Sequence, residues 1–472
     1  MAAERLLKQT AKTATGAKAK LRGLAGLAAC LLLAHSGLTQ QSGLNSQALI
    51  YMDYPQPSGE VESLQLTELP KWATVDLQIR ERGESQSSDG YVAGNDAIYA
   101  LSRVWGGLEI RPTKWLTGYM QFVDAHALGL PLKYTAANQR DSFDDRQAFL
   151  AFHARGVTVI AGRQELRYGG ERLLGISNWT NTSRTFDGFV GRIGNKNRLD
   201  LFSASVVVVH PTSLDTHGAG LTFHGAVGTV TTWVPHMVIQ PFVYIRALPR
   251  IESQQKTYGT ETEVTPGAEV SATLPRGFYF DTLGALQRGS YSNDSIRSGA
   301  GYAKFGYTAQ RVNWKPRLGG EYDYASGNPK SDLQRIGTFD QQYPSNHNAF
   351  GLTDLFGFQN IKEERINLDL APAKRMTMLI QQEWLRVSTV RDSVYGGSGS
   401  ATVKAPTGGF LSDDIGREFD ASGQYAFLRD GLLTLNAGAG HLSPGALMRE
   451  NAHGSPLTLA YCGLTYRFRV NR

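Results

Sequence analysis

Four arginines that lie close together in the sequence carry side chains that could bind an anion. They are Arg163, Arg167, Arg172 and Arg184. A guanidinium group is planar and permanently charged, so it suits carboxylates and sulfates, and several of them around a pore would favour anions. The acids Glu165, Glu171 and Asp187 lie among them. For each arginine the alternative is therefore an arginine–acid ladder that stiffens the chain.

Other residues that could do chemistry form weaker patterns. Asp141, Asp144 and Asp145 could bind calcium, but their spacing lacks the calcium-loop pattern, so a solvated acidic loop is the better interpretation. Scattered histidines without the spacing of zinc ligands are His210, His217, His224 and His236. No serine has the sequence context of a nucleophile elbow, although a triad from distant strands needs none. We predict no metal, no cofactor and no catalytic residues.

The chain that must position these side chains alternates in polarity. Near the C-terminus, Leu464, Tyr466 and Phe468 share one face, while Thr465 and Arg467 share the other. A period of two over about ten residues matches a transmembrane β-strand. The same alternation recurs at 75–80, 116–122, 365–370, 418–427 and 433–440. No stretch after residue 40 approaches the roughly 20 apolar residues of a membrane helix.

Short and long connections alternate between the predicted strands. The short ones lie near 111–114, 155–156, 194–197, 234–236, 274–277, 311–315, 371–374 and 429–431. The longer ones lie near 83–96, 125–142, 166–183, 209–216, 247–263, 289–297, 325–360, 388–415 and 443–456. Short periplasmic turns and long extracellular loops are typical of outer-membrane barrels. The sequence predicts an all-β fold: a transmembrane antiparallel β-barrel of about 18 strands, with 16 as the alternative, over residues 71–472.

Strand parity predicts which charged side chains face the lumen. The basic candidates are Arg80, Arg103, Arg365, Arg467 and Arg469. The acidic candidates are Asp76, Glu109, Glu321, Asp323, Glu363, Asp369, Glu418 and Asp420. We therefore expect a lumen of mixed charge rather than a uniformly basic one.

The N-terminal segment predicts export from the cytoplasm. Residues 1–36 place a basic stretch, an apolar run and a small-residue cleavage signal in the order of a secretory signal peptide. This segment holds most of the formal net charge of +6, so nothing in the rest of the chain points to nucleic acid. Residues 37–70 are predicted to be a flexible lead-in. Cleavage would leave Cys462 alone, without an internal disulfide.

Two blocks of sequence resemble the alginate-export family. The first runs through Gly162-Arg163-Gln164 and Gly169-Gly170-Glu171-Arg172-Leu173 to Trp179 and Arg184-Thr185-Phe186-Asp187-Gly188. The second runs from Tyr324-Ala325-Ser326-Gly327 through Phe339-Asp340, Pro344 and His347 to Gly351-Leu352-Thr353-Asp354. The resemblance implies an outer-membrane channel of the alginate-export type, and it leaves the cargo and the direction of transport open.

Three functions are consistent with these patterns. The first is an outer-membrane channel for passive passage of a polysaccharide, an oligosaccharide or another polar, anionic or neutral solute. The second is a plugged barrel that binds something outside, and the third is a barrel enzyme. Expected partners are outer-membrane lipid, the solute and periplasmic secretion proteins, in the outer membrane of a Gram-negative-type bacterium.

The apolar content of the loop at 166–183 predicts its position. Leu173, Leu174, Ile176 and Trp179 are too apolar for a loop in open water. We expect the loop to fold inward and narrow the pore, so that the four neighbouring arginines meet the solute. Packing of Trp179 against other external loops, with the arginines at the rim, is the alternative.

Overall fold

The structure is a computed structural model that describes residues 69–218, 220–330, 332, 334–347, 349–428 and 432–471. The predicted signal peptide at 1–36 and nearly all of the predicted lead-in at 37–70 lie outside these residues, so both stay predictions.

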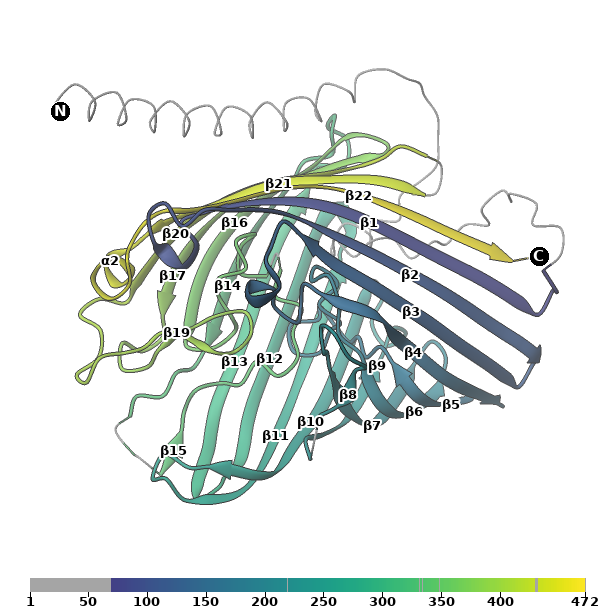
Figure 1. Ribbon diagram of the computed structural model, residues 1–472, viewed down its shortest axis with the longest axis horizontal. Helices are drawn as coiled ribbons and strands as arrows, with labels where there is room; N and C mark the ends of the chain where they lie inside the picture. The colour runs from purple at the N-terminus through teal and green to yellow at the C-terminus, as the bar shows by residue number, and fades with distance from the viewer. Residues whose placement is uncertain are drawn as a thin grey trace. The chain divides into compact units, whose positions relative to one another are not determined.

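Eighteen antiparallel strands form one closed barrel, as the sequence predicted. The barrel strands are β1 (Ala73–Ser87), β2 (Ala97–Thr113), β3 (Leu116–Leu128), β4 (Asp141–Ala154), β5 (Val157–Gln164), β6 (Phe186–Gly194), β7 (Arg198–Val208), β9 (Thr222–Thr229), β10 (Met237–Glu252), β11 (Tyr258–Thr273), β12 (Phe278–Tyr291), β13 (Asp294–Thr308), β14 (Arg317–Ala325), β16 (Ile361–Ala373), β17 (Met376–Val387), β20 (Asp414–Ala426), β21 (Leu433–Pro444) and β22 (Leu457–Asn471). Figure 1 shows them side by side, with β22 next to β1. The pairing of β1 with β22 closes the barrel.

The remaining elements belong to the connections. They are β8 (Thr216–His217), β15 (Arg335–Ile336), β18 (Val394–Tyr395), β19 (Ala401–Val403), the helix α2 (Ala446–Asn451) and 3-10 turns at Asp89–Tyr91, Leu132–Tyr134 and Pro275–Gly277. No helix within the described ranges is long and apolar enough to span a bilayer.

The barrel wall has an apolar outside and a polar inside. Phe305 is 61% exposed and Ile366 is 52% exposed on the outer face, where lipid would cover them. The inward Arg103 and Glu383 are almost completely buried. A closed barrel also pairs the backbone groups of every strand, which a bilayer core requires. Alternation in the sequence thus becomes a wall with one lipid face and one lumen face.

Connections at the two ends of the barrel differ in length. One end, which we call the short-turn end, has tight links such as residues 155–156 between β4 and β5. The opposite long-loop end carries residues 165–185, 326–360 and 388–413. This alternation agrees with the predicted order of turns and loops.

Two of the predicted long loops are mostly strand. In place of loops at 247–263 and 289–297, the chain forms extended hairpins that turn at 253–257 and 292–293. These hairpins have polar residues on both faces, so the alternation of apolar and polar residues that indicates a strand is missing there. The inward Glu261 there bonds Arg246 of β10, at 2.6 Å from its Nη2.

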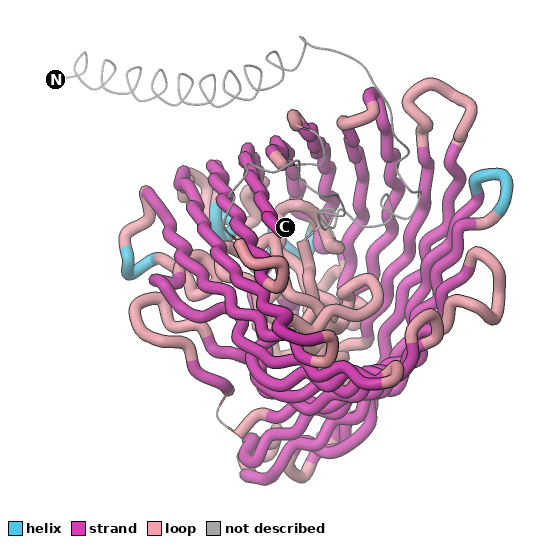
Figure 2. The backbone as a smooth tube through the Cα atoms, turned by 90° about the vertical axis from the view of Figure 1, so that its right-hand side faces the viewer, coloured by secondary structure: helices cyan, strands magenta, loops and turns pink. Residues whose placement is uncertain are grey.

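Two long loops turn into the barrel. We call residues 165–185 the first inward loop and residues 326–360 the second inward loop. Figure 2 shows loop segments inside the ring of strands. The largest hydrophobic cluster joins their buried residues to the wall: Leu174 and Phe186 lie in it with Tyr343, Phe350 and Phe358. The core of this protein therefore lies partly inside the barrel.

Candidate functional site

The first inward loop is held by two arginines of the barrel wall. Arg80 of β1 donates to the carbonyl oxygens of Asn178 at 2.8 Å and Thr180 at 2.9 Å. Arg103 of β2 donates to the same Thr180 oxygen at 3.1 Å and to Oδ1 of Asn178 at 3.0 Å. Both arginines are at least 98% buried. Both arginines bond the loop backbone and the side chains of Asn178 or Asn181, so they position the loop.

Trp179 of this loop is contacted by three side chains. The guanidinium of Arg82 lies 3.5 Å from the centre of the indole ring. His347, from the second inward loop, stacks on the indole at 3.5 Å with an interplanar angle of 3°. Tyr461 of β22 meets it edge-on at 4.8 Å. Trp179 therefore contacts both the wall and another loop, which combines the two alternatives from the sequence.

Glu171 and Arg184 join the two inward loops to each other. Glu171 Oε2 accepts hydrogen bonds from the hydroxyl of Ser345 at 2.6 Å and from the Ile176 amide at 3.0 Å. Arg184 donates to the carbonyl oxygens of Tyr343 at 2.7 Å and Pro344 at 3.0 Å. Burial lowers the pKa of Arg184 to about 10, so it stays charged at neutral pH, where the carbonyl oxygens solvate it.

Gly175 allows the loops to approach this closely. A Cβ atom there would lie 2.3 Å from Oε2 of Glu171 and 2.6 Å from the Ser345 hydroxyl. Its amide donates to the carbonyl oxygen of Tyr343 at 2.8 Å. A side chain at this position would therefore clash with Glu171 of the same loop and with Ser345 of the other loop.

Arg172 and Arg365 lie in a buried network of acids. Arg172 pairs with Glu321, and with Asp323 at 3.2 Å. Although burial acts to lower it, those two carboxylates hold the pKa of Arg172 above its usual value. Arg365 pairs with Glu383 at 3.1 Å and also with Glu363.

These two arginines also hold the second inward loop. Arg172 donates to the carbonyl oxygen of Ala349 at 2.9 Å, and Arg365 bonds the same oxygen. The wall acids Glu418 and Asp420 accept from the amides of Thr353 at 2.9 Å and Leu352 at 3.0 Å. Arg365, Glu418 and Asp420, which parity places in the lumen, are therefore in contact with the second inward loop that they hold.

Arg163 lies at the end of β5, where it pairs with acids. Its Nε is 2.9 Å from Asp187 Oδ1, and its Nη1 is 3.4 Å from Asp145 Oδ2. Its side chain is 11% exposed.

Arg167 is the predicted loop arginine that is most open to the interior. Its Nε lies 2.8 Å from Glu171 Oε1, and its side chain is 25% exposed. The barrel encloses two interior cavities. The first, of about 230 Å³, is lined by residues of the barrel strands from β12 to β22. The second, of about 260 Å³, is lined by residues of β1 to β4 and of β22. Both cavities are lined by Arg167 and Asn178. The first inward loop therefore lies between them.

The charges that line these two cavities nearly balance. The basic side chains are eight: Arg146, Arg167, Arg172, Lys304, Arg317, Arg365, Arg467 and Arg469. The acidic side chains are seven: Asp76, Glu109, Glu165, Glu171, Asp281, Glu321 and Asp369. The expected mixed lumen is what the geometry shows, and a selectivity role for any of the seven predicted arginines stays a prediction.

Several residues of this site were missing from the sequence-based candidates. Arg82 shares the inward parity of Arg80, and Lys304 follows the period of its strand, so parity could have found both. Arg146 faces inward next to Gln147 because the register shifts there, and simple parity misses it. His347 lies in the second block that resembles the family, but its contact with Trp179 has no local signal in the sequence, and Tyr461 has none either.

The barrel resembles solved outer-membrane proteins of Pseudomonas aeruginosa in fold. OpdK, in a structure with vanillate, aligns with a TM-score of 0.59 at 11% identity, covering 84% of this chain and 99% of that one. OccK3 (OpdO) aligns with a TM-score of 0.58 at 11% identity, covering 86% and 98%. OpdQ gives 0.55 at 13% identity, covering 84% and 99%. A search of curated protein sequences finds no significant match.

A family model described as alginate export matches residues 71–457. The match contains both sequence blocks, which form the two inward loops and the strand ends beside them. Family and fold together support an outer-membrane channel and an outer-membrane location, without naming the solute. The chain belongs to the alginate export family.

Proposed function

We propose that this protein is a passive channel for small polar solutes, including sugars that carry a carboxylate. The observation that carries the proposal is the pair of polar interior cavities on either side of the first inward loop, both lined by Arg167. A solute that crosses the barrel would pass this side chain. Passage needs no chemical step, so the expected site has no catalytic residues.

The cavities are lined by eight basic and seven acidic side chains, so we expect the channel to prefer anions only weakly. Arg172 and Arg365 face acids at short distance, so little of their charge remains for a solute. Arg167 pairs with Glu171, and its side chain remains 25% exposed to the interior. Charge acts more strongly in a narrow, partly dehydrated passage than in bulk water. We assign the selectivity mainly to Arg167 and only indirectly to Arg80, Arg103, Arg163, Arg172, Arg184 and Arg365.

A carboxylated solute fits both the family and the site. The family description names alginate, a polymer of uronic acids, and the OpdK structure contains vanillate, an aromatic carboxylate. The inward loops occupy much of the interior, which favours short oligosaccharides over a bulky folded cargo. The periplasmic partners stay a prediction.

Flux into liposomes tests the proposal. Purified protein in vesicles is compared for entry of glucose and glucuronate, which differ by one carboxylate. We expect both to enter, and we expect Arg167→Gln to slow glucuronate relative to glucose. The matched control is Arg391→Gln, because Arg391 is an exposed arginine of another long loop. Failure of both sugars to enter wild-type vesicles would contradict a channel.

A plugged barrel that binds a partner outside is the second candidate. The second inward loop favours it, because Phe350, Leu352, Phe356 and Phe358 are at most 1% exposed and act as a hydrophobic core within the barrel. In the flux experiment, a sealed barrel gives no entry of either sugar.

A further inference from the structure

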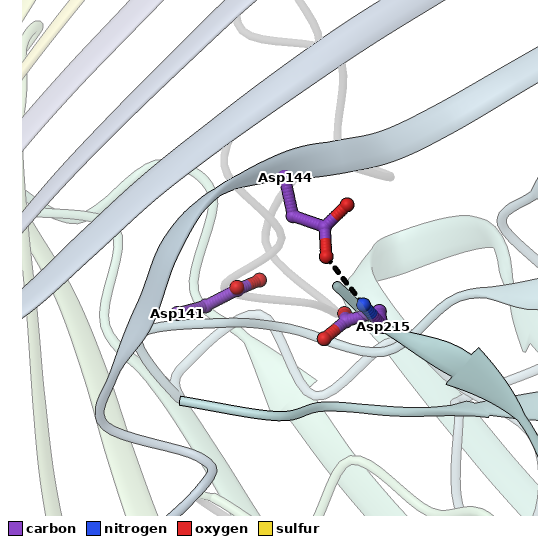
Figure 3. A group of neighbouring side chains, drawn as sticks. All are labelled: Asp141, Asp144 and Asp215. Atoms are coloured by element: carbon purple, nitrogen blue, oxygen red, sulfur yellow. Dashed lines mark hydrogen bonds between the residues drawn. The ribbon is translucent and has the colours of Figure 1, made fainter. Parts of the chain in front are cut away.

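Three aspartates from two distant parts of the chain meet at the long-loop end of the barrel. Asp141 and Asp144 lie at the start of β4, and Asp215 ends the loop between β7 and β8. One carboxylate oxygen from each lies within 4.8 Å of the others. Figure 3 shows the three side chains converging, with the Asp144 carboxylate bonded to the Asp215 amide. The cluster differs from the acidic loop expected from the sequence, because Asp215 replaces Asp145.

One of these carboxylates is buried without compensation. Asp141 and Asp144 are each 2% exposed. Oδ1 of Asp141 has no hydrogen-bond partner among the described residues, and its carboxylate is directed toward Asp215 (Figure 3). A buried ionised carboxylate without a partner is costly, so it takes a proton or a cation.

The other two carboxylates are held in place by backbone amides. Asp144 accepts from the amides of Asp145 at 2.6 Å and Asp215 at 2.5 Å. Asp215 Oδ1 accepts from the His210 amide at 2.8 Å. These bonds orient the carboxylates toward one point, and each carboxylate oxygen has a further lone pair for a ligand.

The neighbouring arginine forms its ion pairs with acids outside the cluster. Arg163 pairs with Asp187 and Asp145, and it reaches Asp215 only through the backbone carbonyl, at 3.5 Å. Among the described residues, no cationic side chain is therefore bonded to the three carboxylates.

We propose that Asp141, Asp144 and Asp215 bind a calcium ion that ties the 209–215 loop to the start of β4. Calcium takes carboxylate oxygens in irregular geometry and completes its shell with water, whereas magnesium demands a near-ideal octahedron. The site is formed by the fold rather than by one sequence loop, since Asp215 lies 71 positions after Asp144.

Calorimetric titration of the full-length, detergent-purified protein with Ca²⁺ tests the site after treatment with a chelator. We expect saturable binding that Asp141→Asn weakens by about tenfold or more, as loss of a ligand should cost at least as much as loss of a supporting residue. Asp413→Asn, the same change at an exposed position in another long loop, is the control and should bind as wild type does. Equal binding by Asp141→Asn, or no saturable binding by wild type, would overturn the proposal.

Thermal unfolding separates a cation site from carboxylates that share a proton. We expect Ca²⁺ to raise the unfolding temperature of wild type but not of Asp141→Asn. In chelator, Asp141→Asn should be at least as stable as wild type, because one repelling charge is gone. If Asp141→Asn fails to refold, Asp215→Asn gives the same comparison. A stability gain in both variants, without any effect of Ca²⁺ on wild type, assigns the cluster to a shared proton and rejects the ion.

Discussion

At the scale of single residues, the arginines of this protein differ by what they bond. Arg80, Arg103 and Arg184 donate to loop carbonyl oxygens, so their charge fixes backbone. Arg172 compensates buried acids, while Arg167 faces two cavities. Residues of one type and one neighbourhood therefore have separate tasks.

Loss of Arg172 should destabilise the barrel more than loss of Arg167. Arg172→Gln leaves Glu321 and Asp323 buried with less compensation, which costs about 3–5 kcal/mol when a buried pair is broken. Arg167→Gln breaks a partly exposed pair with Glu171, worth about 1 kcal/mol or less. Urea-dependent unfolding in lipid vesicles measures both. Equal losses of stability would mean that both arginines have the same structural task.

Trp179→Ala should loosen the first inward loop. The substitution removes contacts with Arg82, His347 and Tyr461. Because Trp179 is only partly buried, we expect a cost below the about 3–5 kcal/mol of a fully buried aromatic-to-alanine change. We expect faster hydrogen exchange in residues 165–185 and larger single-channel conductance. Trp233→Ala is the control, because Trp233 is 74% exposed in a turn at the other end. Unchanged exchange and conductance in Trp179→Ala would show that the loop is held without the indole.

Sequence parity predicts the direction of these side chains but not their partners. Arg80, Arg103 and Arg365 point inward as the alternation indicates. Their contacts depend on where the loops fold: the Ser177 amide bonds the Ser345 hydroxyl at 2.8 Å across 168 positions of sequence. No local pattern encodes a contact at that separation.

At the scale of elements, strands were predictable where lipid requires an apolar face. The predicted connections at 155–156, 194–197 and 325–360 agree closely with those of the structure. The loops predicted at 247–263 and 289–297 were wrong, because polar residues cover both faces of the hairpins there and the alternation disappears. Alternation in the sequence therefore predicts the lipid-facing wall better than the full length of the strands.

A charge on the lipid face tests this assignment of the wall. Ile366→Arg, near the middle of β16 and 52% exposed, should impair refolding, since an arginine near the bilayer midplane costs about 2–4 kcal/mol. Gln424→Arg in β20 introduces the same residue toward an interior cavity and should be tolerated. Heat-modifiable mobility on gels and refolding yield measure the difference. A reversed order would show that the inner and outer faces are exchanged.

At the scale of the whole molecule, a closed barrel supplies the wall and the two inward loops supply the passage. The family blocks form both loops, which hold each other through Glu171, Arg184 and Trp179. Wall and passage are thus separate parts: alternation specifies the first, and long-range contacts specify the second. The central claim is that solute and ions pass the side chain of Arg167.

Charge introduced chemically at this position tests that claim most directly. Arg167→Cys, in a Cys462→Ser background, is recorded in planar bilayers under a salt gradient, before and after reaction with methanethiosulfonate reagents. We predict that the negatively charged ethylsulfonate reagent shifts the reversal potential toward cation preference and that the positively charged trimethylammonium reagent shifts it toward anion preference. Arg391→Cys should show neither shift. Complete labelling of Arg167→Cys without any shift, or a wild-type barrel that conducts no current, would contradict the account.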